Sequence, residues 1–253
     1  MLIDERRHLI AEAVLSKGAA TVAQLSESFS VSQVTIRSDL EALEAQGILR
    51  RNRGGAVANA IDRYLPAFQE RSSVNQAAKQ AIAEAAVDLV RDGDWIIVDA
   101  GSTTLYAIDH FKHRRLTIAV NSVYSANKLV DAPHVELIQI GGILYRPALC
   151  FVGKLAASHL NELNFDRVFL GVNGIAPAGI SVNNCLEVGI KQKMIDCSSE
   201  VIVLADASKV GVKSLARIAP LDCVHKFITD RSATKDVLAP LREANPDLEV
   251  IVA

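Results

Sequence analysis

The chain has 253 residues, of which 50% are hydrophobic and 22% are charged, so it carries enough apolar side chain to build a full core and is not disordered. This length suggests about two domains. The net charge of -2 excludes a uniformly basic protein that coats nucleic acid through bulk charge, but it leaves room for a local basic patch.

The sequence also bears on location and on metals. No stretch approaches the ~18 consecutive apolar residues of a membrane helix, and the N-terminus is charged where a signal peptide would be apolar. We therefore expect a cytoplasmic protein that contacts no membrane. The four cysteines form no Cys-x-x-Cys pair and have no His at the spacing of a metal site, so we expect neither a metal nor a cofactor.

The first part of the chain has the pattern of three helices followed by a hairpin. Apolar residues recur there at helical spacing. Thr21 and Gln24 fit a capping box that opens the second helix, and Ser32 is a good N-cap for the third. A short hairpin over residues 48–57 follows, and its tip carries Arg53 and two glycines. We predict a winged helix-turn-helix domain over residues 1–57.

The third predicted helix carries its apolar residues at Val34, Ile36, Leu40 and Leu43, which a 3.6-residue period cannot turn perfectly to one side. In a helix-turn-helix this helix lies in the ~12 Å major groove and presents its first turns to base edges. Gln can bind adenine and Arg can bind guanine, while Thr, Ser and the arginines of a wing can contact phosphate. The candidate residues for binding double-stranded operator DNA are Ser32, Gln33, Thr35, Arg37, Ser38, Arg50, Arg51 and Arg53.

A helical bundle whose polar stripe faces water is the alternative for this region, and the wing favours DNA binding over it. Residues 1–57 hold seven basic and seven acidic side chains, so the domain is neutral and the rest of the chain carries the charge of -2. We therefore expect DNA affinity to depend on base contacts and oligomerisation rather than on bulk charge.

A pattern of fixed spacing runs through the third helix and the wing. It consists of Val31, Ser32, Thr35, Ile36, Arg37, Asp39, Leu40, Leu43, Gly47, Leu49, Arg51, Gly54, Gly55 and Ala56. This pattern resembles the N-terminal motif of DeoR-type bacterial transcriptional regulators, which implies a DNA-binding regulator. Members of that family usually carry Arg-Arg where this chain has Arg37-Ser38, and commonly a His where it has Arg53. These departures concern which DNA sequence is recognised.

The pattern changes in the second part of the chain. Residues 58–73 lack a sustained period and contain Pro66, so we predict a linker there. An Ala-rich helix then leads to the first of seven short apolar runs, which are typical of buried strands. The runs span residues 95–99, 116–120, 135–140, 167–172, 201–205, 227–229 and 248–252. Helical segments separate most of them, so we predict an α/β domain over residues 74–253 with a mainly parallel sheet.

Polar and glycine-rich residues follow several of these runs, at the ends where parallel sheets bind ligands. Residues 101–104, Gly-Ser-Thr-Thr, follow the first run and open a helix. Glycine allows close approach of the backbone, and hydroxyls with free N–H groups at a helix start suit phosphate. An ordinary N-cap turn is the alternative for this loop taken alone.

The same stretches resemble the C-terminal sensor domain of the DeoR family, which is similar in fold to ribose-5-phosphate isomerase and glucosamine-6-phosphate deaminase. The resemblance now covers nearly the whole chain and implies a phosphorylated sugar as effector. It implies that the loop holds the phosphate with Lys209 as counter-charge, and that Asp99, Asn121, Gly142 and Glu187 line the sugar end. The candidate effector-binding residues are Asp99, Gly101, Ser102, Thr103, Thr104, Asn121, Gly141, Gly142, Glu187 and Lys209. Lys209 as a solvated loop lysine, and Glu187 as a carboxylate that stabilises a helix dipole, remain alternatives.

Two functions compete on this basis. One is a transcriptional regulator, by family habit a repressor of carbohydrate-catabolism genes, which binds DNA as a homodimer or homotetramer and is released by a sugar phosphate. The other is a sugar-phosphate isomerase or deaminase with an accessory N-terminal module, in which Asp99, Glu187 and Lys209 move protons. No obvious acid/base pair lies in the loops, so we predict a regulator without catalytic residues. A purely structural oligomerisation protein explains neither the wing nor the loops.

Overall fold

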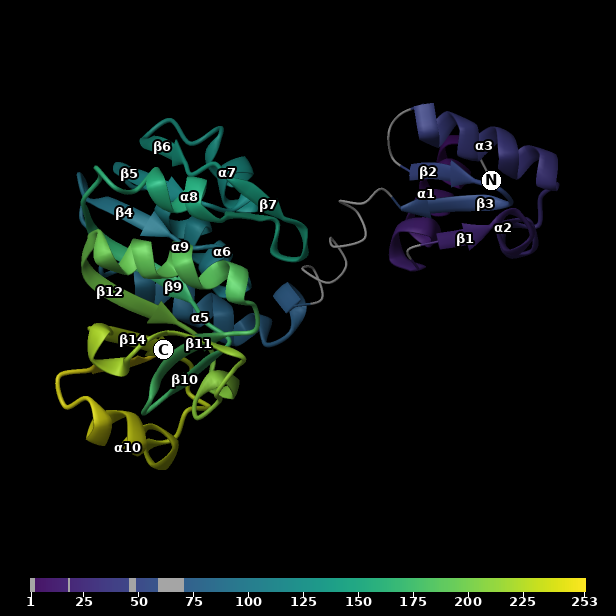
Figure 1. Cartoon of the computed structure of the whole chain (residues 1–253). Helices are drawn as coiled ribbons and strands as arrows, with labels where there is room; N and C mark the ends of the chain where they lie inside the picture. The colour runs from purple at the N-terminus through teal and green to yellow at the C-terminus, as the bar shows by residue number, and fades with distance from the viewer. Residues whose placement is uncertain (1–2, 18, 46–48, 59–70) are drawn as a thin grey trace. The chain divides into compact units, whose positions relative to one another are not determined.

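The computed structural model divides the chain into two compact units, Met1–Arg71 and Ser72–Ala253 (Figure 1). It describes residues 3–17, 19–45, 49–58 and 71–253. Gly47 of the sequence motif and residues 59–70 of the predicted linker lie outside the described residues. Each unit is described by itself.

The first unit is a winged helix-turn-helix, as predicted. Its elements are α1 (Ile3–Lys17), β1 (Ala19–Thr21), α2 (Val22–Phe29), α3 (Gln33–Ala45), β2 (Leu49–Asn52) and β3 (Gly55–Ala58). The hairpin of β2 and β3 turns at Arg53 and Gly54, and β1 adds a third strand in the order β1-β3-β2. Gly55 is required at the pairing of β1 with β3, because a Cβ there would lie 2.2 Å from the carbonyl oxygen of Ala20.

Local sequence signals account for the helix starts of this unit. The predicted capping box is present, since Gln24 N–H donates to Thr21 Oγ1 at 3.2 Å and Thr21 N–H donates to Gln24 Oε1 at 3.0 Å. Ile36 and Leu40 of α3 are buried in the core of the unit, whereas Val34 is 72% exposed. Two residues along a helix turn a side chain by about 200°, so Val34 and Ile36 point to opposite sides.

The second unit is built on a seven-stranded sheet in the order β15-β14-β12-β9-β4-β5-β6, in which every neighbouring pair is parallel. All seven apolar runs of the sequence form these strands, as predicted. The strands are β4 (Trp95–Val98), β5 (Leu116–Val120), β6 (Val135–Gln139), β9 (Phe165–Gly171), β12 (Ser198–Leu204), β14 (Lys226–Thr229) and β15 (Glu249–Val252).

Helices cover both faces of this sheet and give three layers. The first face carries α5 (Gln76–Val87), α6 (Ser102–Phe111) and α7 (Val123–Leu129), and the second carries α8 (Lys154–Ser158), α9 (Cys185–Asp196) and α10 (Lys235–Ala244). Alternate residues of each strand enter the two cores: Ile96 and Val98 of β4 face α5 and α6, while Ile97 lies in the core that contains α9. Phe111 and Phe169 join α6 to the sheet, with ring centroids 4.8 Å apart.

Short antiparallel strands and three 3-10 turns complete the second unit. They are the pair β7 (Ile143–Tyr145) and β8 (Cys150–Val152), the sheet of β10 (Gly174–Ala176), β11 (Gly179–Val182) and β13 (Ala216–Ala219), and the 3-10 turns η1 (Arg146–Ala148), η2 (Ala207–Lys209) and η3 (Leu221–Cys223). These strands were not predicted, because three or four residues outside a continuous apolar run show too little alternation to be recognised from sequence. Among the described helices of the chain, none has the length and apolar character that crossing a membrane requires.

Candidate DNA-binding face and effector site

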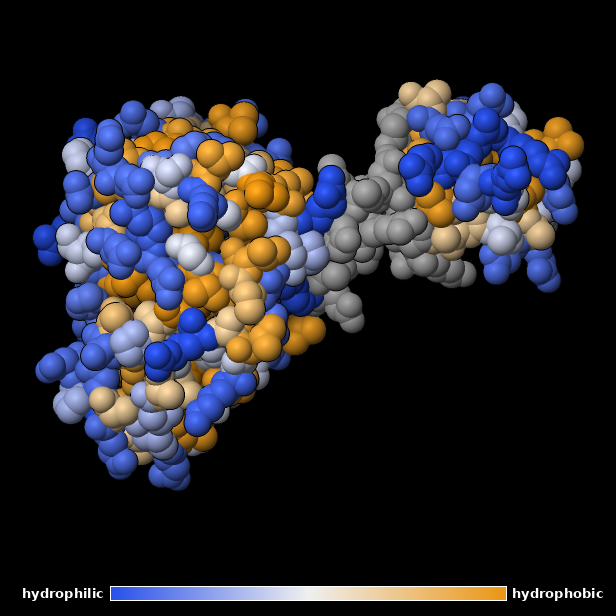
Figure 2. Space-filling model, viewed as in Figure 1, coloured by the Kyte–Doolittle hydropathy of each residue, from blue (hydrophilic) through white to orange (hydrophobic). Residues whose placement is uncertain are grey.

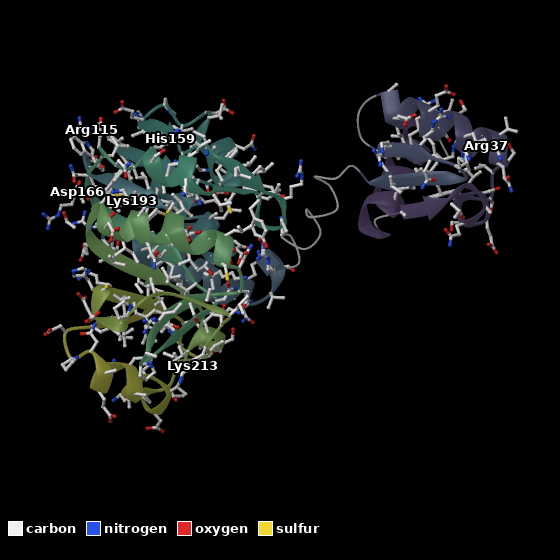
Figure 3. The ribbon with its side chains drawn as sticks, viewed as in Figure 1. Arg37, Arg115, His159, Asp166, Lys193 and Lys213 are labelled. Carbon is white, nitrogen blue, oxygen red and sulfur yellow. The ribbon has the colours of Figure 1, made fainter. Side chains whose placement is uncertain are left out.

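The exposed side of α3 carries most of the candidate DNA-reading residues. Gln33 is exposed at the start of the helix, Arg37 and Ser38 are exposed one turn further on, and Val34 lies among them. Figure 3 shows Arg37 projecting from the first half of α3. Arg37 Nη2 donates to Gln33 Oε1 at 3.4 Å, which aligns the two side chains along the helix. A guanidinium and a carboxamide one turn apart suit hydrogen bonds to neighbouring base edges.

Ser32 and Thr35 form the N-cap of this helix. Ser32 Oγ accepts a hydrogen bond from the N–H of Thr35 at 3.1 Å, and the two hydroxyl oxygens lie 2.8 Å apart. The prediction of Ser32 as N-cap is therefore confirmed. The hydroxyls remain at the exposed end of α3, where phosphate contacts are geometrically open to them.

The wing holds its three arginines in different ways. Arg51 donates from its backbone N–H and from Nε to Glu44 of α3, at 2.8 and 2.9 Å. The backbone hydrogen bond and the guanidinium of Arg51 lower the pKa of Glu44. Arg51 therefore ties the wing to α3, while Arg50 and Arg53 are exposed in the hairpin. The structure thus favours Arg50 and Arg53 over Arg51 for phosphate contacts.

Asp39 is a buried acid on the inner side of α3. It is 2% exposed and accepts from Arg6 Nε at 2.6 Å and from Arg7 Nε at 3.0 Å, so it joins α1 to the DNA-reading helix. Burial alone would raise the pKa of Asp39, but the hydrogen bonds and charges of Arg6 and Arg7 outweigh it and lower that pKa. The sequence motif contains Asp39, and the structure gives it a positioning role for α3.

We expect Asp39→Asn to destabilise the first unit at pH 7 and to have little effect in strong acid. The lowered pKa means that the pair stabilises the fold above the ordinary Asp pKa of ~3.9 and loses this effect as the pH falls through the lowered value. Thermal unfolding followed by circular dichroism at pH 7 and in acid tests this. Trp95 is the single Trp and reports on the second unit separately. Glu41→Gln, an exposed change on the same helix, is the control, and equal pH profiles for Asp39→Asn and the wild type would contradict the prediction.

In the second unit, the candidate effector residues other than Glu187 of α9 lie at the carboxyl ends of four strands of the sheet. Asp99 to Thr104 follow β4, Asn121 follows β5, Gly141 and Gly142 follow β6, and Lys209 lies beyond β12. Strand β9, which lies between β12 and β4, ends at Gly171. The chain runs outward from β4 through β5 and β6 and then returns to β9 on the other side of β4. Open α/β sheets bind ligands at such a reversal of strand order.

Asp99 and Lys191 form a buried ion pair at this reversal point. Both residues are 1% exposed, and Lys191 Nζ of α9 donates to Asp99 Oδ2 and, at 2.9 Å, to the carbonyl oxygen of Gly171. The N–H of Gly171 donates to the same carboxylate oxygen at 3.1 Å. Glu187 Oε2, one turn earlier on α9, lies 3.9 Å from Lys191 Nζ. Asp99 and Glu187, both predicted from sequence, thus share one lysine.

The electrostatics of this pair are set by burial. Burial raises the pKa of Asp99 despite the opposing charge of Lys191. Burial also disfavours the ammonium of Lys191, but the carboxylates of Asp99 and Glu187 outweigh it and raise its pKa. Asp99 Oδ1 is buried and has no hydrogen-bond partner among the described residues. A buried carboxylate oxygen without a donor is costly, and a ligand hydroxyl is the kind of group that satisfies it.

The predicted phosphate loop opens α6. Gly101 precedes the helix and has no side chain to cap it, so N–H groups of the first turn remain for another acceptor. Ser102 is half-buried, whereas Thr103 and Thr104 are buried. Thr104 Oγ1 lies 2.7 Å from the carbonyl oxygen of Asp99, to which it donates. The structure thus gives Thr104 a part in shaping the loop.

The remaining candidates brace or border this region. Asn121 is buried; its Oδ1 accepts from the N–H of Ala100 at 2.9 Å, and its Nδ2 donates to the carbonyl oxygen of Phe151. Gly142 has φ 148°, and a Cβ there would lie 2.9 Å from Ala156 Cβ. The N–H of Gly141 donates to Nδ1 of His159, which Figure 3 labels. Lys209 is half-buried in η2.

Lys191 belongs to this site but was not among the residues predicted from sequence. A lysine inside a helix usually lies in solvent, and no local pattern shows which face of α9 packs on the sheet. Its spacing of four residues from Glu187 was an available signal, because residues four apart share a helix face. Among the described residues, no cluster of three or more His, Cys, Asp or Glu side chains has the geometry of a metal site.

Comparison with known proteins places both units in one family. The family model described as the DeoR-like helix-turn-helix domain matches residues 6–62, and that described as the DeoR C terminal sensor domain matches residues 74–231. Among solved structures, ribose 5-phosphate isomerase A from Methanocaldococcus jannaschii matches with a TM-score of 0.40 at 19% identity, over 53% of this chain and 54% of that chain.

Curated relatives match over most of their length. A protein of Escherichia coli O157:H7 named as a transcriptional repressor of the aga operon is 35% identical over 98% of this chain and 93% of its own. The HTH-type transcriptional regulator YulB of Bacillus subtilis is 37% identical over 91% and 90%, and an L-fucose operon activator of Haemophilus influenzae is 33% identical over 90% and 92%. The chain therefore belongs to the DeoR family and is a DNA-binding transcriptional regulator rather than an enzyme.

Proposed function

We propose that this regulator represses an operon for carbohydrate use and releases its operator when a phosphorylated sugar binds the second unit. The observation that carries the effector assignment is the orphaned Oδ1 of Asp99 beside the uncapped start of α6. A carboxylate acceptor next to free N–H groups at a helix start matches a molecule with both hydroxyls and a phosphate. The relative named for the L-fucose operon supports a sugar-related role.

In this proposal the protein acts in the cytoplasm as a homodimer or homotetramer. Two copies of α3 would then lie about one helical turn of DNA apart, near 34 Å, on a palindromic or repeated operator. Repression is the direction we infer, although one relative is named an activator. Transcription from the adjacent promoter in a strain that lacks this protein tests the direction: expression should rise, and a fall would make the protein an activator.

The segment that leads toward the first unit is tied to the proposed effector loops. Asn75 Nδ2 donates to Asp206 Oδ1 at 3.1 Å, and Asp206 is the N-cap of the turn that carries Lys209. Tyr106 Oη of α6, the helix that starts at the phosphate loop, donates to the carbonyl oxygen of Ser72 at 3.3 Å. These contacts give effector binding a direct route to the chain that continues into the DNA-binding unit.

Effector binding is tested by a thermal-shift screen of phosphorylated sugars, with inorganic phosphate as a separate arm. A ligand at 100 times its Kd adds about 2.7 kcal/mol to the native state. We expect Ser102→Asp and Lys209→Gln to abolish this shift while leaving operator binding intact. An aspartate at the first position of α6 suits the helix dipole but repels a phosphate, so folding is preserved.

Lys213→Gln is the matched control for this experiment. Lys213 is an exposed lysine four residues beyond Lys209 and is labelled in Figure 3. Its substitution by Gln therefore removes the same charge from the same region. It should leave the thermal shift unchanged. A full response in both Ser102→Asp and Lys209→Gln would show that the phosphate site lies elsewhere.

Coupling to DNA is tested with Asn75→Gly combined with Tyr106→Phe. Asn75 has φ 54°, and glycine keeps this backbone conformation while removing only the side-chain hydrogen bond. We expect this variant to bind operator and effector as the wild type does, but to lose most of the 5- to 150-fold change in operator affinity that a typical coupling of ~1–3 kcal/mol gives. If the effector changes the operator affinity of this variant as much as that of the wild type, the proposed route is refuted.

A further inference from the structure

The DNA-reading face of α3 contains one aliphatic side chain. Val34 lies in the first turn of the helix and is 72% exposed, with Gln33 beside it and Arg37 and Ser38 one turn further on. Figure 2 shows hydrophilic residues over most of α3 and a hydrophobic group at the end where the helix begins. An exposed valine is unexpected in the centre of a surface that binds its partner through hydrogen bonds.

The described residues of the first unit give no structural reason for a valine at this position. Val34 is absent from the core cluster formed by Ile36, Leu40 and Leu43 of the same helix with residues of the other elements. Capping of α3 depends on Ser32. Valine is also a weaker helix former than the straight-chain polar residues that usually occupy an exposed helix position. Neither packing nor helix stability therefore favours a valine here.

The chemistry of the major groove does favour it. Each base edge there offers hydrogen-bond donors and acceptors, and the C5 methyl of thymine is the one apolar group. Three residues of a helix rise by about 4.5 Å, close to the ~3.4 Å step between base pairs, so Val34 and Arg37 reach neighbouring base pairs. We propose that Val34 packs against the C5 methyl of a thymine next to the base pair that Arg37 contacts, and so selects for thymine at that position.

The test uses DNA sites selected by the full-length wild-type protein from a random duplex library. In the best site, each thymine is replaced singly by uracil, which removes the methyl and keeps the hydrogen-bonding groups. We expect one position in each half-site where uracil weakens wild-type binding about fourfold, the effect of losing one buried methyl at ~0.8 kcal/mol. Val34→Ala should bind the thymine and uracil forms of that position equally.

The controls separate this contact from general effects on the domain. Ile3→Ala removes another exposed aliphatic side chain of the same unit and should keep the full uracil sensitivity. At the same position, 5-methylcytosine should give tighter binding than cytosine for the wild type but not for Val34→Ala. The reason is that 5-methylcytosine presents the same C5 methyl as thymine, whereas cytosine lacks it. The proposal is overturned if no single uracil weakens wild-type binding, or if Val34→Ala remains as sensitive to uracil as the wild type.

Discussion

Replacing Arg37 by alanine should weaken binding to the selected operator about 5- to 150-fold, because a bidentate contact from arginine to guanine is worth ~1–3 kcal/mol. Arg37 is exposed, and its side-chain hydrogen bond to Gln33 is long at 3.4 Å. The melting temperature should therefore change little. Titration of the selected site and of variants mutated at single positions measures both the affinity and the loss of preference at the position that Arg37 reads.

Arg53→Gln is the informative contrast to this variant. Arg53 lies at the tip of the wing, where a phosphate contact adds affinity without sequence preference. Its replacement should weaken binding to all sequences alike and reduce the slope of log affinity against log salt by about one for each wing on the DNA. If Arg37→Ala keeps both its full affinity and its full sequence preference, the DNA-reading surface does not lie at the start of α3.

The first unit was largely predictable because its signals are local. A capping box at Thr21 and an N-cap at Ser32 involve neighbours in sequence, so the starts of α2 and α3 could be placed. Strand β1 could not, because its three residues become a strand only by pairing with β3, 34 or more residues later. The roles of Asp39 and Arg51 were equally hidden, since their partners Arg6 and Glu44 lie on other elements.

The second unit shows the same division. Its seven strands could be predicted because each is a run of apolar residues. Parallel strands bring their carboxyl ends to one edge of the sheet, so Asp99 and Asn121 could be assigned to a common region. The order of the strands is a tertiary property. Only that order places Gly171 beside Asp99 and brings Lys191 of α9 onto both. The anchor of the candidate site thus depends on packing that the sequence pattern leaves open.

Breaking the Asp99–Lys191 pair from one side should destabilise the second unit strongly. Lys191→Met leaves the carboxylate of Asp99 in a buried site without its counter-charge, which costs about 3–5 kcal/mol in comparable pairs. Asp99→Asn leaves the ammonium of Lys191 with the carboxylate of Glu187 at 3.9 Å. The loss should therefore be smaller than in Lys191→Met. Urea unfolding followed by Trp95 fluorescence measures these changes in the free energy of unfolding.

The double variant Asp99→Asn/Lys191→Met decides how the pair acts. Removing both charges also removes the desolvation cost of each, so the double variant should lose less stability than the sum of the two single variants. Lys193→Met is the control on the same helix, because Lys193 is only half-buried and should change the free energy of unfolding little. Additive losses would show that the two side chains stabilise the fold independently. A stable double variant that no longer responds to sugar phosphates would instead show that the charged pair is kept at the strand ends for the ligand rather than for the fold.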